Sequence, residues 1–171
     1  QREETPEDIR RSVPVIKDII AAMNIPALQA DGFEADDIIG TLAVKAGGLG
    51  VETYMLTPDK DYGQLVRDNV FIFRPRHGGG YEKMGPKEVC AKYAIDSPQR
   101  VIDLLALMGD SADNFPGCPG VGEKTAAKLI AQFGDVDNML ENTADIKGKL
   151  REKVETAVDD IRMSKFLATI R

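Results

Sequence analysis

Three acidic clusters, each at an end of an apolar segment, constrain the fold of this chain more than any other sequence feature. The first opens an expected helix near residue 34, the second follows an apolar strand that ends at residue 56, and the third follows an apolar helix that ends at residue 108. Their carboxylates are Glu34, Asp36, Asp37, Asp59, Asp61, Asp110 and Asp113. If packed together, these groups would repel and raise one another's pKa values. Hard divalent cations relieve that cost, and Mg²⁺ suits a site with few protein ligands and many waters.

Each cluster also has an ordinary structural explanation. The acids of the first cluster would favour the positive end of a helix dipole. The second could be a common Asp-rich loop, and the third a helix-ending Asx turn. The clusters are more informative together, because sites in open α/β sheets lie beyond the carboxyl ends of strands. We therefore expect the seven carboxylates to converge on one surface cleft.

The pattern of apolar residues divides the chain into an α/β half and a helical half. The expected strands are residues 25–30, 51–56 and 70–73. The expected helices are residues 6–23, 34–46, 64–66, 86–93, 98–108, 124–133 and 149–163. Pro14 is expected to kink the first helix, and residues 77–80 to form a turn. This order predicts an α/β domain over residues 1–95 and a helical region over 96–171.

Composition leaves the class of partner open. The 171 residues are 43% hydrophobic and 29% charged, which is typical of a globular protein. No apolar run is long enough to span a membrane. The two cysteines, Cys90 and Cys118, lack metal-binding spacing and indicate a reducing, cytoplasmic setting. The net charge of −6 becomes +1 without the seven clustered carboxylates, so it does not exclude binding to nucleic acid.

A glycine-rich segment at residues 117–126 superficially resembles a phosphate-binding P-loop. That motif requires Lys directly after its last Gly, but here Glu123 intervenes, and the preceding element is an expected helix rather than a strand. A hairpin between two helices fits better, because its glycines allow close backbone approach to a partner. Amides at the start of the following helix could bind phosphate. A simple glycine turn is the structural alternative.

The four motifs occur in the same order in the 5′ nuclease domain of bacterial DNA polymerase I, which the chain resembles along essentially its whole length. They are Gly-Phe-Glu-Ala-Asp-Asp (32–37), Asp-Lys-Asp (59–61), Gly-Asp-x-x-Asp-Asn (109–114) and Pro-Gly-Val-Gly-Glu-Lys-Thr-Ala (119–126). The resemblance implies part of a mainly parallel sheet of the PIN-like 5′ nuclease fold, followed by a helix–three-turn–helix. It also implies a structure-specific 5′→3′ exonuclease and flap endonuclease of DNA replication and repair.

The same resemblance implies roles for individual residues. Glu34, Asp36 and Asp37 would serve one Mg²⁺ ion, and Asp59, Asp61, Asp110 and Asp113 a second, in a two-metal phosphodiester hydrolysis. Mn²⁺ could substitute, and K⁺ could bind backbone carbonyls of the helix–three-turn–helix. The implied DNA-binding residues are Arg2, Lys60, Gly120, Val121, Gly122, Lys124 and Thr125. His77, the only histidine, is expected at the surface without a catalytic role.

The resemblance also carries expectations about the whole protein. The substrate would be DNA with a 5′ flap, nick or RNA primer, and the protein a bacterial cytoplasmic monomer fused to a polymerase. The family's domain begins earlier, with a strand that carries another metal-binding Asp. We therefore expect a chain cut short at both ends, with impaired cleavage. The alternatives are a non-catalytic module that binds duplex DNA and a stand-alone relative with weakened nuclease activity.

Overall fold

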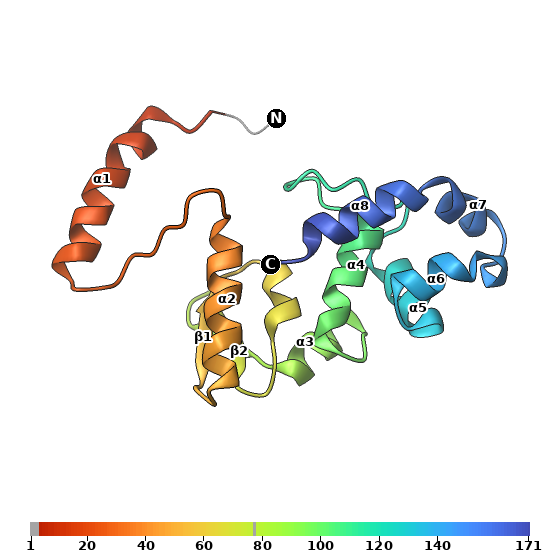
Figure 1. The fold of residues 1–171 in the computed structure, drawn as a ribbon, viewed down its shortest axis with the longest axis horizontal. Coiled ribbons are helices and arrows are strands. Elements are labelled where there is room, and N and C mark those ends of the chain that lie inside the picture. Colours follow the sequence, from red (N-terminus) through yellow and green to blue (C-terminus); the bar gives the residue numbers. More distant parts are fainter. Residues whose placement is uncertain (1–3, 77) are drawn as a thin grey trace. The chain divides into compact units, whose positions relative to one another are not determined.

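The computed structural model describes residues 4–76 and 78–171, so the expectations for Arg2 and His77 lie outside the described residues. The chain comprises two compact units, Gln1–Ile38 and Ile39–Arg171. The boundary falls within helix α2 (Ala35–Gly48), close to the helix expected over residues 34–46. Figure 1 shows the order of the elements along the chain.

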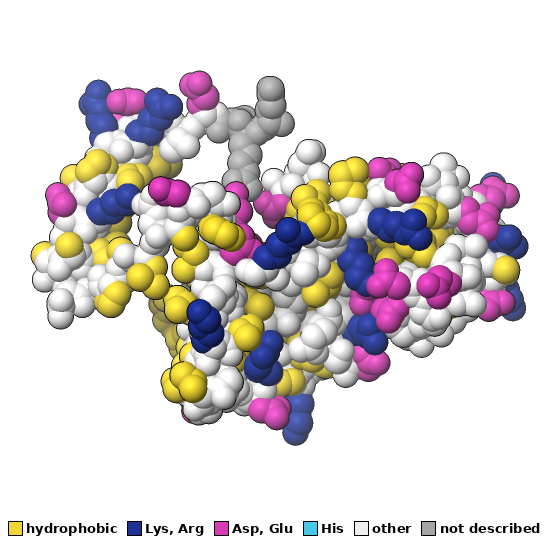
Figure 2. All heavy atoms as spheres, in the orientation of Figure 1, with side chains coloured by type: hydrophobic (Ala, Val, Ile, Leu, Met, Phe, Trp, Pro, Cys, Tyr) yellow, Lys and Arg dark blue, Asp and Glu magenta, His cyan; other side chains and the backbone are white. Residues whose placement is uncertain are grey.

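The first unit contains helix α1 (Glu7–Ala22), which begins with two acidic residues and continues past Pro14. None of its residues is buried, and Figure 2 shows its apolar side chains on the surface. The strand expected over residues 25–30 is wrong, since every residue of this segment is exposed and none belongs to a strand. Pro26 interrupts the run with a residue that has no N–H to donate, which disfavours a paired strand.

The second unit is built on a three-stranded sheet of order β1-β2-β3, of which Figure 1 labels β1 and β2. Strand β1 (Thr53–Leu56) pairs in parallel with β2 (Val70–Pro75), and the two strands overlap those expected over residues 51–56 and 70–73. Strand β3 (Tyr81–Met84) was not predicted from the sequence, and it pairs antiparallel with β2 across the short connection 76–80. The described sheet is therefore mixed, with one parallel and one antiparallel pair.

Alternation along the strands gives the sheet one buried face. Met55, Ile72 and Met84 face the core, whereas Tyr54 and Tyr81 on the opposite face are about half exposed. Because successive side chains of a strand point to opposite faces, each strand contributes to both. Helix α2 is tied to β2 through Gly47, whose carbonyl accepts a hydrogen bond of 2.9 Å from the Asn69 side chain.

After β3 the described chain is helical. The elements are α3 (Pro86–Tyr93), η2 (Pro98–Arg100), α4 (Val101–Met108), α5 (Glu123–Phe133), α6 (Val136–Glu141), η3 (Thr143–Asp145), α7 (Lys149–Thr156) and α8 (Val158–Ala168). The strongly apolar α4 lies at the centre and packs along α8 (Figure 1). The single helix expected over residues 149–163 is two helices, separated at Ala157.

Within residues 4–76 and 78–171, no helix combines the length and the apolar character needed to cross a membrane.

Candidate functional site

The second acidic cluster occupies the loop between β1 and the short 3₁₀ helix η1 (Asp61–Leu65). The backbone N–H of Asp59 donates to the Thr57 hydroxyl at 3.1 Å, and the N–H of Asp61 donates to Asp59 Oδ1 at 3.0 Å. These bonds form local turns that start η1 directly after the carboxyl end of the strand. They leave the Asp59 side chain exposed and turn Asp61 into the protein.

Asp61 is the most perturbed acid of the site. Its residue surface is only 7% exposed, and its Oδ1 atom has no hydrogen-bond partner among the described residues. Burial, followed by the nearby charges of Asp59, Asp110 and Asp113, raises the pKa of Asp61 to about 7, although the charge of Lys60 acts to lower it. A desolvated carboxylate with an unpaired oxygen fits a hard divalent cation. Such an ion neutralises the negative charge of the carboxylate and coordinates its unpaired oxygen.

The third cluster lies in a tight loop between α4 and the glycine hairpin. Asp110 and Phe115 exchange two backbone hydrogen bonds of 3.1 and 2.7 Å, which close the loop. Two glycines with positive φ make this possible: Gly109 at +70° and Gly117 at +60°. A Cβ on Gly117 would lie 2.3 Å from the Gly109 nitrogen, so the backbones meet at a distance that only glycine allows.

An ion pair joins the second and third clusters. The Lys60 ammonium donates a hydrogen bond to Asp110 Oδ2, and the other Asp110 oxygen accepts the N–H of Ala112 at 2.8 Å. The bond from Lys60 holds the pKa of Asp110 below its usual range. Together with the charge interactions of Asp113, these contacts place Asp59, Asp61, Asp110 and Asp113 in one neighbourhood of the second unit.

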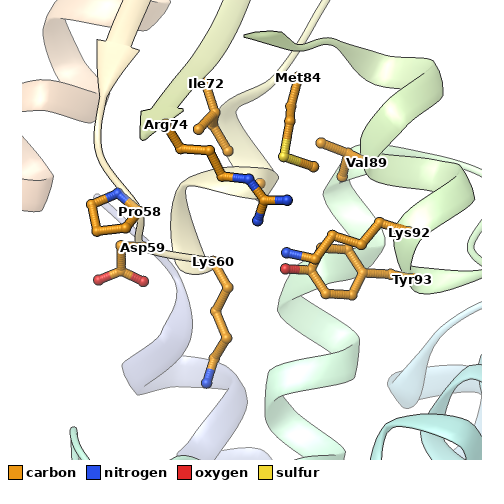
Figure 3. Close-up of a pocket in the computed structure, with 10 residues that line it drawn as sticks. Pro58, Asp59, Lys60, Ile72, Arg74, Met84, Val89, Lys92 and Tyr93 are labelled. Atoms are coloured by element: carbon orange, nitrogen blue, oxygen red, sulfur yellow. The ribbon is translucent and has the colours of Figure 1, made fainter. Parts of the chain in front are cut away.

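A small cavity borders this neighbourhood on the side of the sheet. Figure 3 shows Asp59 and Lys60 at its edge, with Lys60 extended away from Arg74 and Lys92. Arg74 is already paired with Glu82 at 2.7 Å. The cavity holds about 10 Å³, room for one water molecule, so it is not a ligand pocket. The chemistry of the site therefore belongs to the two acidic loops.

The first acidic cluster lies on another unit of the chain. Glu34 precedes α2, Asp36 and Asp37 occupy its first turn, and Asp37 Oδ2 accepts the N–H of Glu34 at 3.3 Å. These three residues belong to the unit Gln1–Ile38, so their convergence with the other four carboxylates stays a prediction. Among residues 4–76 and 78–171, no three His, Cys, Asp or Glu side chains are already arranged to hold a metal ion.

The glycine hairpin leads into α5 and presents the expected phosphate-facing positions. Gly120, Gly122 and Lys124 are exposed. Val121 is only 4% exposed, and its N–H donates to the Cys118 carbonyl at 3.0 Å, so it anchors the turn to the core. Thr125 is half-buried, and its N–H donates to the Gly122 carbonyl at 3.0 Å.

Two contacts made by lysine side chains were not predicted from the sequence. Lys153 of α7 places its Nζ 2.6 Å from the position that a Cβ on Gly120 would take, which puts a positive charge beside the hairpin. The Lys60–Asp110 pair joins residues 50 positions apart. Neither contact has a local sequence signature, because both depend on how distant segments pack.

Comparison with known families assigns both halves of the chain. Residues 1–94 match the 5′-3′ exonuclease N-terminal resolvase-like domain, and residues 96–171 match the 5′-3′ exonuclease C-terminal SAM fold. The chain belongs to the 5′-3′ exonuclease family. This assignment confirms the family resemblance and the order of an α/β part followed by a helical part.

Relatives of this 5′-3′ exonuclease family chain include DNA polymerase I of Bacillus subtilis, 43% identical over 171 residues, and the thermostable DNA polymerase I of Thermus filiformis, 41% identical over 171 residues. Each alignment covers 99% of this chain but only 19% and 20% of those proteins, respectively. The chain thus spans about a fifth of the length of these relatives.

Solved structures support the fold. The T5 5′-exonuclease with bound zinc ions matches with a TM-score of 0.81 and 22% identity, over 96% of this chain and 62% of that one. The catalytic core of Rad2 in complex with DNA substrate matches with a TM-score of 0.60 and 19% identity, over 92% and 50% of the two chains. At these identities the likeness concerns the fold.

Proposed function

We propose that this chain is a divalent-metal-dependent 5′ nuclease module that hydrolyses phosphodiester bonds of DNA with a 5′ end, flap or nick. The observation that carries the proposal is the buried Asp61 carboxylate, which lies near enough to Asp59, Asp110 and Asp113 for their charges to raise its pKa. Assembling four acids costs stability unless a cation binds them. Membership of the 5′-3′ exonuclease family supplies the reaction class.

The metal ligands follow from the acidic loops. Asp59, Asp61, Asp110 and Asp113 would hold one Mg²⁺ ion, and Glu34, Asp36 and Asp37 would serve a second, with Mn²⁺ as a substitute. Bound ions of this kind activate water and stabilise the leaving oxygen. Asp61 contributes a carboxylate whose Oδ1 is free of other hydrogen-bond partners among the described residues. The divalent metals in T5 5′-exonuclease structures support this assignment.

The hairpin would hold the duplex beside the cutting site. Gly120 and Gly122 allow close approach of the backbone to a phosphate, and Lys124 adds a positive charge at the start of α5. Backbone carbonyls of the same hairpin would form the K⁺ site. These contacts address phosphates, so they would position the duplex without reading its sequence. An RNA primer would be accepted for the same reason.

The direct test is cleavage of a labelled 5′-flap duplex by the purified chain, with Mg²⁺ or with EDTA. The Asp110→Asn and Asp113→Asn proteins serve as matched variants, because both substitutions remove a charge with little change in shape. Metal-dependent release of the flap, lost in both variants, supports the proposal. Because impaired cleavage is expected of this chain, duplex binding without cleavage favours the non-catalytic DNA-binding alternative when the chain also binds no Mg²⁺ or Mn²⁺.

A further inference from the structure

The Lys60 ammonium supplies the positive charge that links two acidic loops. It donates to Asp110 Oδ2 and lies near the charges of Asp59 and Asp61. Partial burial acts to lower the pKa of Lys60, but the hydrogen bond and charge of Asp110, with the charges of Asp61 and Asp59, raise it overall. The protein therefore stabilises the charged form of this lysine.

The contacts of Asp110 limit what else can bind there. One of its carboxylate oxygens accepts the Lys60 ammonium and the other accepts the Ala112 N–H, while its side chain is only 9% exposed. Each carboxylate oxygen keeps a further lone pair, but a divalent cation bound to Asp110 would lie beside the Lys60 ammonium, and the two positive charges would repel each other. The backbone N–H is fixed by the closed loop between Asp110 and Phe115, whereas Lys60 is a flexible side chain that is 37% exposed. Lys60 is the donor that can move.

One positive charge does not neutralise the cluster. The Lys60 ammonium bonds to Asp110, whereas Asp61 is 7% exposed and its Oδ1 has no hydrogen-bond partner among the described residues. A divalent ion carries twice the charge of an ammonium and binds oxygen ligands directly. Exchange of Lys60 for such an ion would improve the charge balance at Asp61 and release the lysine toward solvent.

We propose that Lys60 is an internal counter-ion of this site: it holds the Asp59–Asp61 and Asp110–Asp113 loops together and leaves Asp110 when a divalent cation binds. This inference rests on the proposed metal-dependent function. It assigns Lys60 a positioning role within the protein, in addition to the contact with DNA that the family resemblance implies. It also predicts that Lys60 and the metal ion compete.

The test compares the wild-type chain with Lys60→Met, which keeps much of the side-chain volume and removes the charge. Lys83→Met is the control, because Lys83 pairs with Glu52 at 3.1 Å on another surface of the same unit. Mn²⁺ affinity is measured by isothermal titration calorimetry without DNA, and Tm is measured in EDTA. We expect Lys60→Met to bind Mn²⁺ about threefold to tenfold more tightly, the range expected from losing one competing ion pair. Its Tm in EDTA should fall by about 2–4 °C.

The outcomes separate the two proposals. Weaker or unchanged Mn²⁺ affinity of Lys60→Met, with normal binding by the wild type and Lys83→Met, overturns the competition and leaves the metal site intact. An unchanged Tm in EDTA overturns the bridging role. Absence of Mn²⁺ binding by all three proteins overturns the proposed function itself, and the displacement of Lys60 with it.

Discussion

Replacing Asp61 with Asn should stabilise the metal-free protein at neutral and alkaline pH. Folding raises the pKa of Asp61 from 3.8 to about 7. A carboxyl whose folded pKa is raised favours folding only while it is protonated, so its contribution is lost as the pH rises from 3.8 through 7. Three pKa units correspond to about 4 kcal/mol at pH 8, and the same relation leaves a penalty of about 2 kcal/mol at pH 5. Asn has nearly the same shape and carries no charge, so it avoids the penalty.

The assay is urea unfolding in EDTA, followed by circular dichroism at pH 5 and pH 8. We expect the free energy of unfolding of Asp61→Asn to exceed that of the wild type by up to about 4 kcal/mol at pH 8. At pH 5 this difference between the two proteins should be about 2–3 kcal/mol smaller. Local relaxation and entry of water would reduce both figures. In saturating Mg²⁺ the order should reverse, because the wild type gains binding free energy that the variant lacks.

Asp68→Asn is the matched control, since Asp68 is exposed in the same unit and its removal should leave stability unchanged. A variant that is no more stable than the wild type at pH 8 would refute the reasoning. A gain that is equal at both pH values would also refute it, because the effect would then not come from the ionised carboxyl.

Three further predictions concern residues around the acidic loops and the glycine hairpin. Gly117→Ala should destabilise the protein by about 2–4 kcal/mol in urea unfolding, because its Cβ would lie 2.3 Å from the Gly109 nitrogen and its φ is +60°. Gly134→Ala is the control: its φ is +84° but nothing lies within 4 Å of the added Cβ, so it should destabilise the protein less. Lys165→Met should lower the free energy of unfolding by about 2 kcal/mol in thermal unfolding, because Asp103 is 3% exposed and loses the nearer of its two ion-pair partners, at 2.9 Å, while it keeps Arg100 at 3.4 Å. An unchanged Tm would exclude this role. Lys124→Ala and Lys153→Ala should each weaken duplex binding equally for DNA of unrelated sequences, and should lower by about one the slope of log binding constant against log salt concentration. Fluorescence titrations measure both effects, with Lys45→Ala as the control. Unchanged slopes would place the DNA contacts elsewhere.

Sequence patterns predicted the elements whose stability is local. Helix α3 was expected over residues 86–93 and runs from Pro86 to Tyr93, because Pro86 suits the first position and the Glu88 side chain accepts the Gly85 N–H at 2.8 Å. The apolar run of α4 likewise predicts a buried helix. The acidic loops after β1 and α4 were located by the same logic, since each follows an apolar element.

Elements that depend on distant partners could not be predicted in this way. Strand β3 has a weak apolar pattern and is supported by pairing with β2, including a stacked Phe73–Tyr81 ring pair with centroids 4.7 Å apart. The division at Ala157 depends on packing, as Ala157 is 4% exposed. For residues 25–30, the apolar composition predicted a strand, but no described strand pairs with it.

The arrangement of the site is explained by the opposing demands of stability and metal binding. A penalty of about 4 kcal/mol at Asp61 is a large part of the roughly 5–15 kcal/mol that stabilises a typical domain. Packing alone would favour an apolar residue at this 7% exposed position. A buried, ionisable group with a strongly raised pKa is therefore more consistent with a chemical role than with a structural one. Lys60 offsets part of the cost through Asp110 while remaining exposed enough to leave. The Lys60–Asp110 ion pair thus holds the two loops near each other before a metal ion binds, and the carboxylates then have to turn toward the ion as Lys60 leaves.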